Sequence, residues 1–112
     1  MNIKRGNIYL ANLNPTLGNE INKTRPVVVI SNDLNNEYNN IITIIPITSN
    51  TKKVFKFEVF LAAGTGNLPK DSKVKVDQIR AIDKLRLGKE IGSLPSALIR
   101  QLEEAVRIHL EL

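Results

Sequence analysis

The chain has 112 residues, and 16 Lys and Arg residues against 11 Asp and Glu residues give it a formal net charge of +5. This length suits a single domain, residues 1–112, and the lack of cysteine excludes disulfide scaffolds, cysteine-bound metals and thiol nucleophiles. No apolar run approaches the roughly 20 residues of a membrane span, and no apolar signal segment follows the first residues, so we expect a cytoplasmic protein that does not contact a membrane.

Six segments of alternating or β-branched apolar residues predict short strands, at 6–11, 26–31, 40–48, 54–61, 73–76 and 78–82. In 54–61 the alternation predicts that Phe55, Phe57 and Val59 face the core and that Glu58 faces away. Pro46 inside the third segment predicts a bulge or a locally unpaired edge. Short strands separated by Gly, Pro and Asn are typical of a small curled barrel or a sandwich.

The last segment predicts a helix. Apolar residues recur at helical spacing over 98–106 with charged residues opposite them, so we expect one face of the helix to pack on the strands. Ser93 or Ser96 is expected to cap its N-terminus, and Pro95 suits its start. His109, the only histidine of the chain, lies on or beside the apolar stripe, and we interpret it as a packing residue.

Three connections stand out by length or composition. The Asn-rich segment 32–40 predicts a turn or a single turn of helix. Segments 12–24 and 62–72 are longer than a hairpin needs, and long loops in small domains are often functional. The first of them leads directly into Arg25, so we expect a site there.

Arg25 precedes a proline, which holds its backbone extended and aims its side chain reproducibly. One interpretation is an anchored guanidinium that binds a phosphate through its paired donors. The other is a surface arginine in a local ion pair, for example with Glu20. Thr48, at the end of the third predicted strand, is placed to present its hydroxyl to the same concavity, whereas the polar residues 50–53 that follow indicate a hairpin turn.

Familiar catalytic patterns are missing from the sequence. A single histidine excludes a two-histidine nuclease mechanism within one chain, and the acidic residues are scattered singly rather than clustered for a hard cation. Neither G-x-x-x-x-G-K-[ST] nor G-x-G-x-x-G occurs. We therefore expect no tightly held metal and no cofactor. The basic excess suits a polyanionic partner, although the richness in Lys, Asn and Ile is equally explained by compositional drift.

Six motifs occur in order along the chain: KRGNIY at 4–9, NPTLGNE at 14–20, KTRPVVVISND at 23–33, IPITS at 45–49, VDQIRAIDKLRL at 76–87 and IGSL at 91–94. With these motifs at these spacings, the sequence resembles the MazF/PemK toxins of bacterial toxin–antitoxin systems over nearly its whole length. The run TRPVVVIS is moderately specific by itself, and together with PITS and DQIRAIDKLRL it makes the resemblance strong.

The resemblance implies a mainly β (α+β) fold, a small SH3-like β-barrel with a C-terminal amphipathic helix, that forms a homodimer. It implies the toxin of a type II toxin–antitoxin system. Such a toxin is a sequence-selective, metal-independent endoribonuclease that cuts single-stranded RNA, leaves a 2′,3′-cyclic phosphate and a 5′-hydroxyl, and needs no cofactor. The implied partners are a cognate MazE-like antitoxin and, through the antitoxin complex, operator DNA.

The family's catalytic arginine and threonine fall on Arg25 and Thr48, the two positions that the local patterns also single out. The expected RNA-binding residues are Leu17, Gly18, Glu20, Asn32, Ser49, Lys52, Lys53, Asp77 and Gln78. The sequence has Asn19 where the family often has Ser, which is expected to alter the preferred RNA sequence, and Asn7 where it often has Asp. We also expect 12–25, 48–56 and 73–80 to form one basic concavity that binds both RNA and an acidic antitoxin segment.

Two other functions are compatible with such a fold. A CcdB-like protein inhibits DNA gyrase by protein contact rather than by cleavage, and the presence of Arg25 and Thr48 in their motifs argues against it. A basic barrel that binds nucleic acid without cutting it normally displays stacking aromatic residues. Aromatic residues make up only 4% of this chain, with no Trp, which argues against that alternative.

Overall fold

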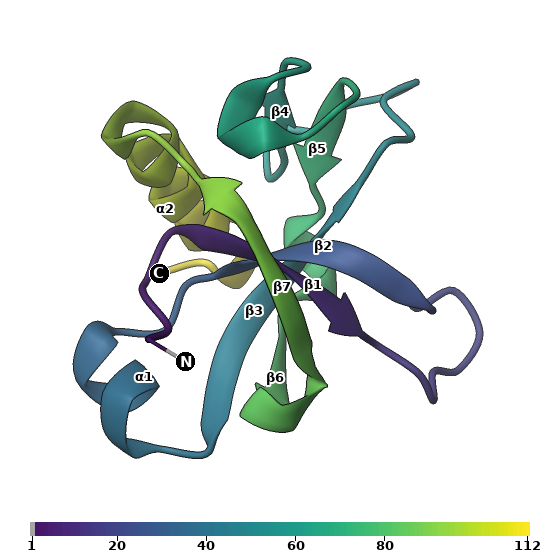
Figure 1. Cartoon of the computed structure of the whole chain (residues 1–112). Coiled ribbons are helices and arrows are strands. Elements are labelled where there is room, and N and C mark those ends of the chain that lie inside the picture. Colours follow the sequence, from purple (N-terminus) through teal and green to yellow (C-terminus); the bar gives the residue numbers. More distant parts are fainter. Residues whose placement is uncertain (1) are drawn as a thin grey trace.

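The computed structural model describes residues 2–112, and its main feature is a curled sheet of seven strands whose pairings are all antiparallel (Figure 1). The strand order is β4-β5-β3-β2-β1-β7, and β6 pairs with β3 outside this path. The strands are β1 (Asn7–Asn12), β2 (Thr24–Val29), β3 (Ile41–Thr48), β4 (Val59–Leu61), β5 (Ser72–Val74), β6 (Arg80–Asp83) and β7 (Leu87–Ser93). Two α-helices, α1 (Asp33–Tyr38) and α2 (Ser96–Leu110), and three short 3₁₀ turns, η1 (Thr65–Asn67), η2 (Val76–Gln78) and η3 (Lys84–Arg86), complete the chain. The predicted mainly β fold with a C-terminal helix is confirmed.

Strand β3 holds the sheet together because it changes partner along its length. Its first half, from Ile41 to Ile44, pairs with β6, and its last two residues pair with β5. Pro46 lies between these two pairings, where it lacks an N–H to donate and its carbonyl accepts a hydrogen bond from the Lys75 amide at 3.0 Å. The irregularity predicted at Pro46 is therefore this change of partner.

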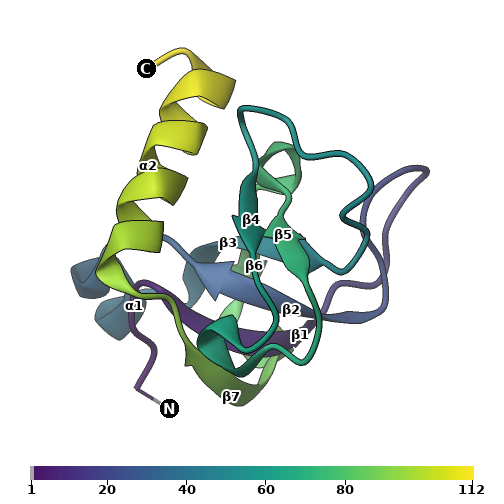
Figure 2. The ribbon, with the colours of Figure 1, turned by 90° about the horizontal axis from the view of Figure 1, so that it is seen from above.

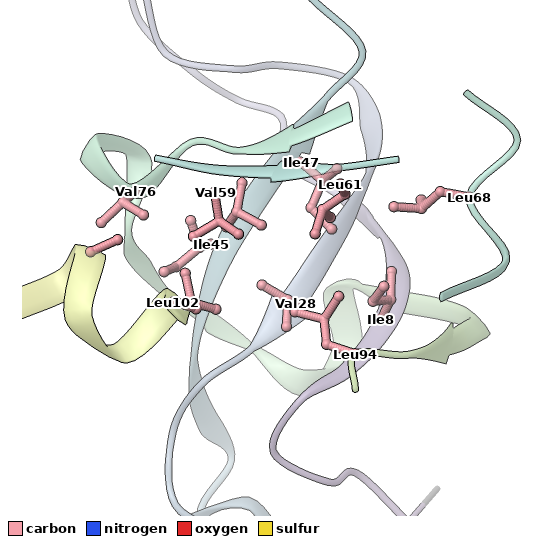
Figure 3. Close-up of a cluster of buried hydrophobic side chains, with 12 residues drawn as sticks. Ile8, Val28, Ile45, Ile47, Val59, Leu61, Leu68, Val76, Leu94 and Leu102 are labelled. Atoms are coloured by element: carbon pink, nitrogen blue, oxygen red, sulfur yellow. The ribbon is translucent and has the colours of Figure 1, made fainter. Parts of the chain in front are cut away.

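The central strands are buried on both faces. One cluster joins Ile8, Val28 and Ile45 of the sheet to β4 and to Leu102 of α2 (Figure 3). A second cluster fills the other face, inside the curl formed by β1, β2, β3 and β6, and includes Val27 and further members Tyr9, Ala11, Leu13, Val29, Ile42, Ile44 and Ile82. Burial on both faces explains why these strands have almost continuous apolar sequences.

Helix α2 lies along one side of the sheet (Figure 2) and packs its buried Leu102 and Ala105 on the first cluster, as predicted. Its capping differs from the prediction. Pro95 is the N-cap residue and has no side-chain cap, so neither predicted serine caps the helix. No helix within residues 2–112 is long and apolar enough to cross a membrane.

Helix α1 realises the turn of helix predicted for 32–40. The Asn32 side chain accepts the Asn35 N–H at 2.8 Å and so caps its N-terminus. The adjacent Asp33 carboxylate accepts the Arg5 backbone N–H at 2.7 Å, and this bond holds the pKa of Asp33 below its ordinary value.

The strand predicted over 54–61 is wrong for its first half. Only Val59–Leu61 pairs in the sheet, whereas Phe55 and Glu58 close a tight turn through mutual hydrogen bonds of 2.9 Å. This turn ends the alternation, so Glu58 is buried at 5% exposure and Phe55 is 41% exposed, the reverse of the prediction. The sequence LGKEIGS of β7 is largely polar and predicts no strand. In the structure β7 forms the end strand of the sheet by pairing with β1.

Strand β7 yields a test of this packing. A Cβ added at Gly92 would lie 2.4 Å from the Gly66 carbonyl oxygen, whereas a Cβ at Gly88 on the same strand meets ordinary contacts of 3.5 Å or more. We expect Gly92→Ala to lower the free energy of unfolding by about 1–3 kcal/mol, as other overpacked sites do. Gly88→Ala is the control and should change it by less than about 0.5 kcal/mol. Urea denaturation checks both, and equal midpoints for the two variants would contradict the close approach of η1 to β7.

Candidate functional site

Arg25 and Thr48 lie at neighbouring ends of β2 and β3. The two strands pair as far as Val27 opposite Pro46, and this register continued by two residues sets Arg25 opposite Thr48. Val28 and Ile47 belong to the first core cluster. Because side chains alternate along a strand, Arg25, three residues before Val28, and Thr48, next to Ile47, both point to the other face. The fold thus places the two predicted catalytic residues at one end and on one face of the sheet.

The Arg25 guanidinium has few competing partners. Its Nε donates to the Asn22 carbonyl at 3.1 Å, which orients the side chain. The alternative ion pair with Glu20 is not formed, and no carboxylate of residues 2–112 pairs with Arg25. Glu20 instead accepts the Leu17 N–H at 2.6 Å. An oriented, unpaired guanidinium at an exposed strand end is suited to binding an anion through its two terminal nitrogens.

Thr48 is half-buried, and its hydroxyl has one identified contact. Its Oγ1 accepts the Asn50 N–H at 3.2 Å, which leaves the hydroxyl proton available to an incoming acceptor. Arg25 and Thr48 therefore both offer hydrogen-bond donors on the same face.

A hollow of about 270 Å³ is lined by Glu20, Ile21, Pro46 and residues 77–80; Pro46 is two residues from Thr48 along β3, and neither Arg25 nor Thr48 lines the hollow. It joins three of the predicted RNA-binding residues, namely Glu20, Asp77 and Gln78. Because the Gln78 side-chain oxygen accepts the Ile21 N–H at 3.1 Å, it also ties the β1–β2 loop to η2.

Two arginines hold the base of the β1–β2 loop. Arg80 donates to the Leu13 carbonyl at 3.2 Å, and Arg86 donates to the carbonyls of Asn12 and Asn14. Beyond these anchors, Leu17 is 83% exposed and Gly18 occupies a left-handed conformation, φ 58°, that favours glycine. Both predicted residues therefore lie at the tip of the loop, away from the hollow itself.

The β3–β4 loop carries Ser49, Lys52 and Lys53, all exposed. Lys53 places its ammonium 4.6 Å from the centre of the Phe55 ring. The Phe55 and Phe57 rings stack with their centres 5.2 Å apart. The centre of the Phe57 ring is 5.5 Å from that of the His109 ring, which agrees with a packing role for the histidine. Both figures show this loop and the β1–β2 loop on the same side of the molecule, opposite α1 (Figures 1 and 2).

Asn32 does not join this group. Asn32 follows the end of β2, whereas Arg25 lies at the start of that strand. The Asn32 side chain caps α1. Six residues of extended strand separate the two ends by roughly 20 Å.

The expected basic concavity is also smaller than predicted, because Lys73 is only 7% exposed and pairs with Glu58. A larger hollow of about 490 Å³ between α2 and residues 28–30 contains none of the predicted site residues.

The fold is a curled antiparallel sheet with a C-terminal helix, and comparisons with known proteins identify the family to which the chain belongs. Residues 4–110 match the family described as PemK-like, MazF-like toxin of type II toxin-antitoxin system, and the chain belongs to this family.

Three relatives illustrate the likeness. Endoribonuclease MazF9 of Mycobacterium tuberculosis is 42% identical, with 98% of each chain covered. The crystal structure of MazF from Deinococcus radiodurans superposes with a TM-score of 0.86 at 24% identity, covering 100% of this chain and 99% of that one. A mycobacterial endoribonuclease in complex with its cognate antitoxin has a TM-score of 0.81 at 20% identity, covering 98% and 96%. The two structures support the fold.

Sequence reasoning missed Glu58, Lys73, Arg80 and Arg86, the residues that hold the loops. The alternation over 54–61 assigned Glu58 to the surface, and lysines in a polar strand gave no sign of burial. The arginines bind backbone carbonyls across 67 and 74 residues of sequence, and no local pattern carries such contacts.

The burial of Lys73 gives a stability prediction. We expect Lys73→Met to lower the free energy of unfolding by about 3 kcal/mol, because it leaves the buried Glu58 carboxylate with Lys75 as its remaining cation. The exposed Lys52 is the matched control, and Lys52→Met should change stability by less than about 0.5 kcal/mol. Chemical denaturation of both variants is the measurement, and a neutral Lys73→Met would refute the pair as a structural contact.

Proposed function

We propose that this chain is an endoribonuclease that cuts single-stranded RNA, with Arg25 and Thr48 at the scissile phosphate. The observation that supports the proposal is the strand register, which, continued by two residues beyond Val27 and Pro46, brings the unpaired Arg25 to the same end of the sheet as the half-buried Thr48. Membership of the toxin family and a relative named as an endoribonuclease support the same activity.

RNA supplies its own nucleophile for such a reaction. The ribose 2′-hydroxyl loses its proton as its oxygen bonds to the adjacent phosphorus, the bond from phosphorus to the 5′-oxygen breaks, and that oxygen takes up a proton. The products are a 2′,3′-cyclic phosphate and a 5′-hydroxyl. The protein has to align these atoms and stabilise the charge that develops on the phosphate. A guanidinium offers only hydrogen-bond donors, so the role of Arg25 is to bind the non-bridging oxygens and the departing 5′-oxygen. Thr48 donates its hydroxyl to a phosphate oxygen.

This mechanism proceeds without a metal ion. Within residues 2–112, no three His, Asp or Glu side chains come together as a set of metal ligands. The positive charge at the phosphate then comes from Arg25 and from the lysines of the β3–β4 loop.

The surface around the pair suits a single strand of RNA. Lys52 and Lys53 on one side are placed to neutralise flanking phosphates. Glu20, Asp77 and Gln78 on the other side line a hollow and offer acceptors and an amide to the edges of an unstacked base, which is the way single-stranded RNA is read in sequence-specific complexes. Sequence-selective cleavage follows from these contacts.

The proposed partners follow from the family and from the charge. A MazE-like antitoxin would inhibit the protein, as the complex of a structural neighbour with its cognate antitoxin supports. The net charge of +5 favours an acidic antitoxin segment through charge steering. We further propose that the chain acts as a cytoplasmic homodimer and that it reaches operator DNA only through the antitoxin complex.

The proposal predicts that Arg25→Ala lowers the single-turnover cleavage rate of a labelled single-stranded RNA at least ~100-fold, because a preorganised charge donor is lost. Thr48→Ala should also slow cleavage without changing the circular dichroism spectrum. Arg100→Ala removes an exposed arginine from α2 and serves as the control, with no loss expected. Full activity in Arg25→Ala would rule out the proposed role of the pair.

A second prediction concerns metal ions. Cleavage should proceed at an unchanged rate in excess EDTA, because the proposed charge donor is a side chain. Activity that EDTA abolishes and magnesium restores would sink the mechanism. RNA that is bound but left intact under all conditions would favour a binding module without cleavage.

A further inference from the structure

A buried ion pair holds the backbone of the β3–β4 loop. The Lys73 ammonium donates to Glu58 Oε1 at 3.0 Å and to the Lys53 carbonyl at 2.6 Å. The same Oε1 accepts the Phe55 N–H at 2.9 Å. Two backbone groups of the loop, the Lys53 carbonyl and the Phe55 N–H, are therefore hydrogen-bonded to one pair of charged side chains. Lys73 belongs to β5, and Glu58 is the residue before β4.

The pair continues through Lys75 to Asp77, whose neighbour Gln78 contacts the other site loop. Lys75 lies 3.8 Å from Glu58 Oε2 and 3.3 Å from Asp77 Oδ1. Asp77 is followed by Gln78, whose side chain binds the Ile21 amide of the β1–β2 loop. This chain of polar contacts joins the two loops that flank Arg25 and Thr48.

Because the Glu58–Lys73 pair is buried, it adds little net stability, and its main effect is on the backbone of the loop. The side chains of Lys73 and Glu58 are 9% and 0% exposed, and taking both charges out of water offsets most of their mutual attraction. An apolar pair of similar volume would stabilise the core as well. It would not, however, offer a donor to the Lys53 carbonyl or an acceptor to the Phe55 N–H, and these directional bonds set the path of the loop.

We propose that Glu58 and Lys73 are positioning residues for RNA, which hold the loop so that Lys52 and Lys53 lie at a fixed distance from Arg25 and Thr48. Neither residue touches RNA; both act through the loop backbone. The inference rests on the proposed endoribonuclease function and deepens it. It also explains why Lys73 and Lys75, although cationic, belong to the scaffold of the site and not to its binding surface.

The test separates positioning from stability by comparing Lys73→Met with the double variant Glu58→Gln/Lys73→Met. The single variant leaves a buried charge, whereas the double variant removes both charges and should recover most of the lost thermal midpoint. Both lack the donor to the Lys53 carbonyl, so we expect KM for a labelled single-stranded RNA to rise about tenfold in both, with kcat within about threefold. Glu103→Gln breaks the exposed Arg5–Glu103 pair, also 3.0 Å long, and is the matched control.

Hydrogen exchange supplies a readout that does not depend on cleavage. Peptides covering 51–58 should exchange faster in Lys73→Met and in the double variant, which both lack the donor to the Lys53 carbonyl, and at an unchanged rate in Glu103→Gln. If KM returns to the wild-type value together with the thermal midpoint, or if exchange over 51–58 is unchanged, the positioning role is wrong. Failure of the proposed function looks different, because then the wild-type protein itself leaves the RNA intact while the exchange difference persists.

Discussion

The change of partner along β3 is the constraint on which the rest of the structure depends. A strand that pairs with β6 at its start and with β5 at its end must bend along its length while both of its faces stay buried. Pro46 at the bend lacks the N–H that a continuous ladder would need. Because β3 leaves the curl at this point, its last residue, Thr48, pairs with Lys73 of β5 and lies at the strand end nearest the start of β2.

The electrostatics of the site depend on which cationic side chains are not already bound to other groups of the protein. Lys73 and Lys75 are engaged with Glu58 and Asp77, and the arginines at 80 and 86 bind loop carbonyls. Arg25 and the lysines of the β3–β4 loop are left for a polyanion. The net charge of +5 therefore indicates a polyanionic partner, whereas the positions of the available cations follow from burial, which composition does not contain.

Much of the fold could be predicted from the spacing of apolar residues. Strands β2 and β3 are buried on both faces, so they appear as continuous apolar runs around Val28 and Ile45, and apolar residues at helical spacing predict α2. The candidate pair could also be found, since Arg25 and Thr48 stand at strand ends in recognisable motifs. Periodicity failed at Glu58, where a turn interrupts the alternation and a partner 15 residues away makes burial of a carboxylate tolerable. It failed at β7, whose polar sequence forms a strand only because β1 offers it a partner.

The most direct test of the central claim is a crystal structure of the protein with a single-stranded RNA that it cuts, in which the 2′-hydroxyl at the cut site is replaced by hydrogen. Such an RNA lacks the nucleophile and binds without reacting. We predict that oxygens of the phosphate at the cut site lie within hydrogen-bond distance of both the Arg25 guanidinium and Thr48 Oγ1, with the flanking strand along the β3–β4 loop. A phosphate bound elsewhere, for example at α1 or in the hollow beside α2, would contradict the account.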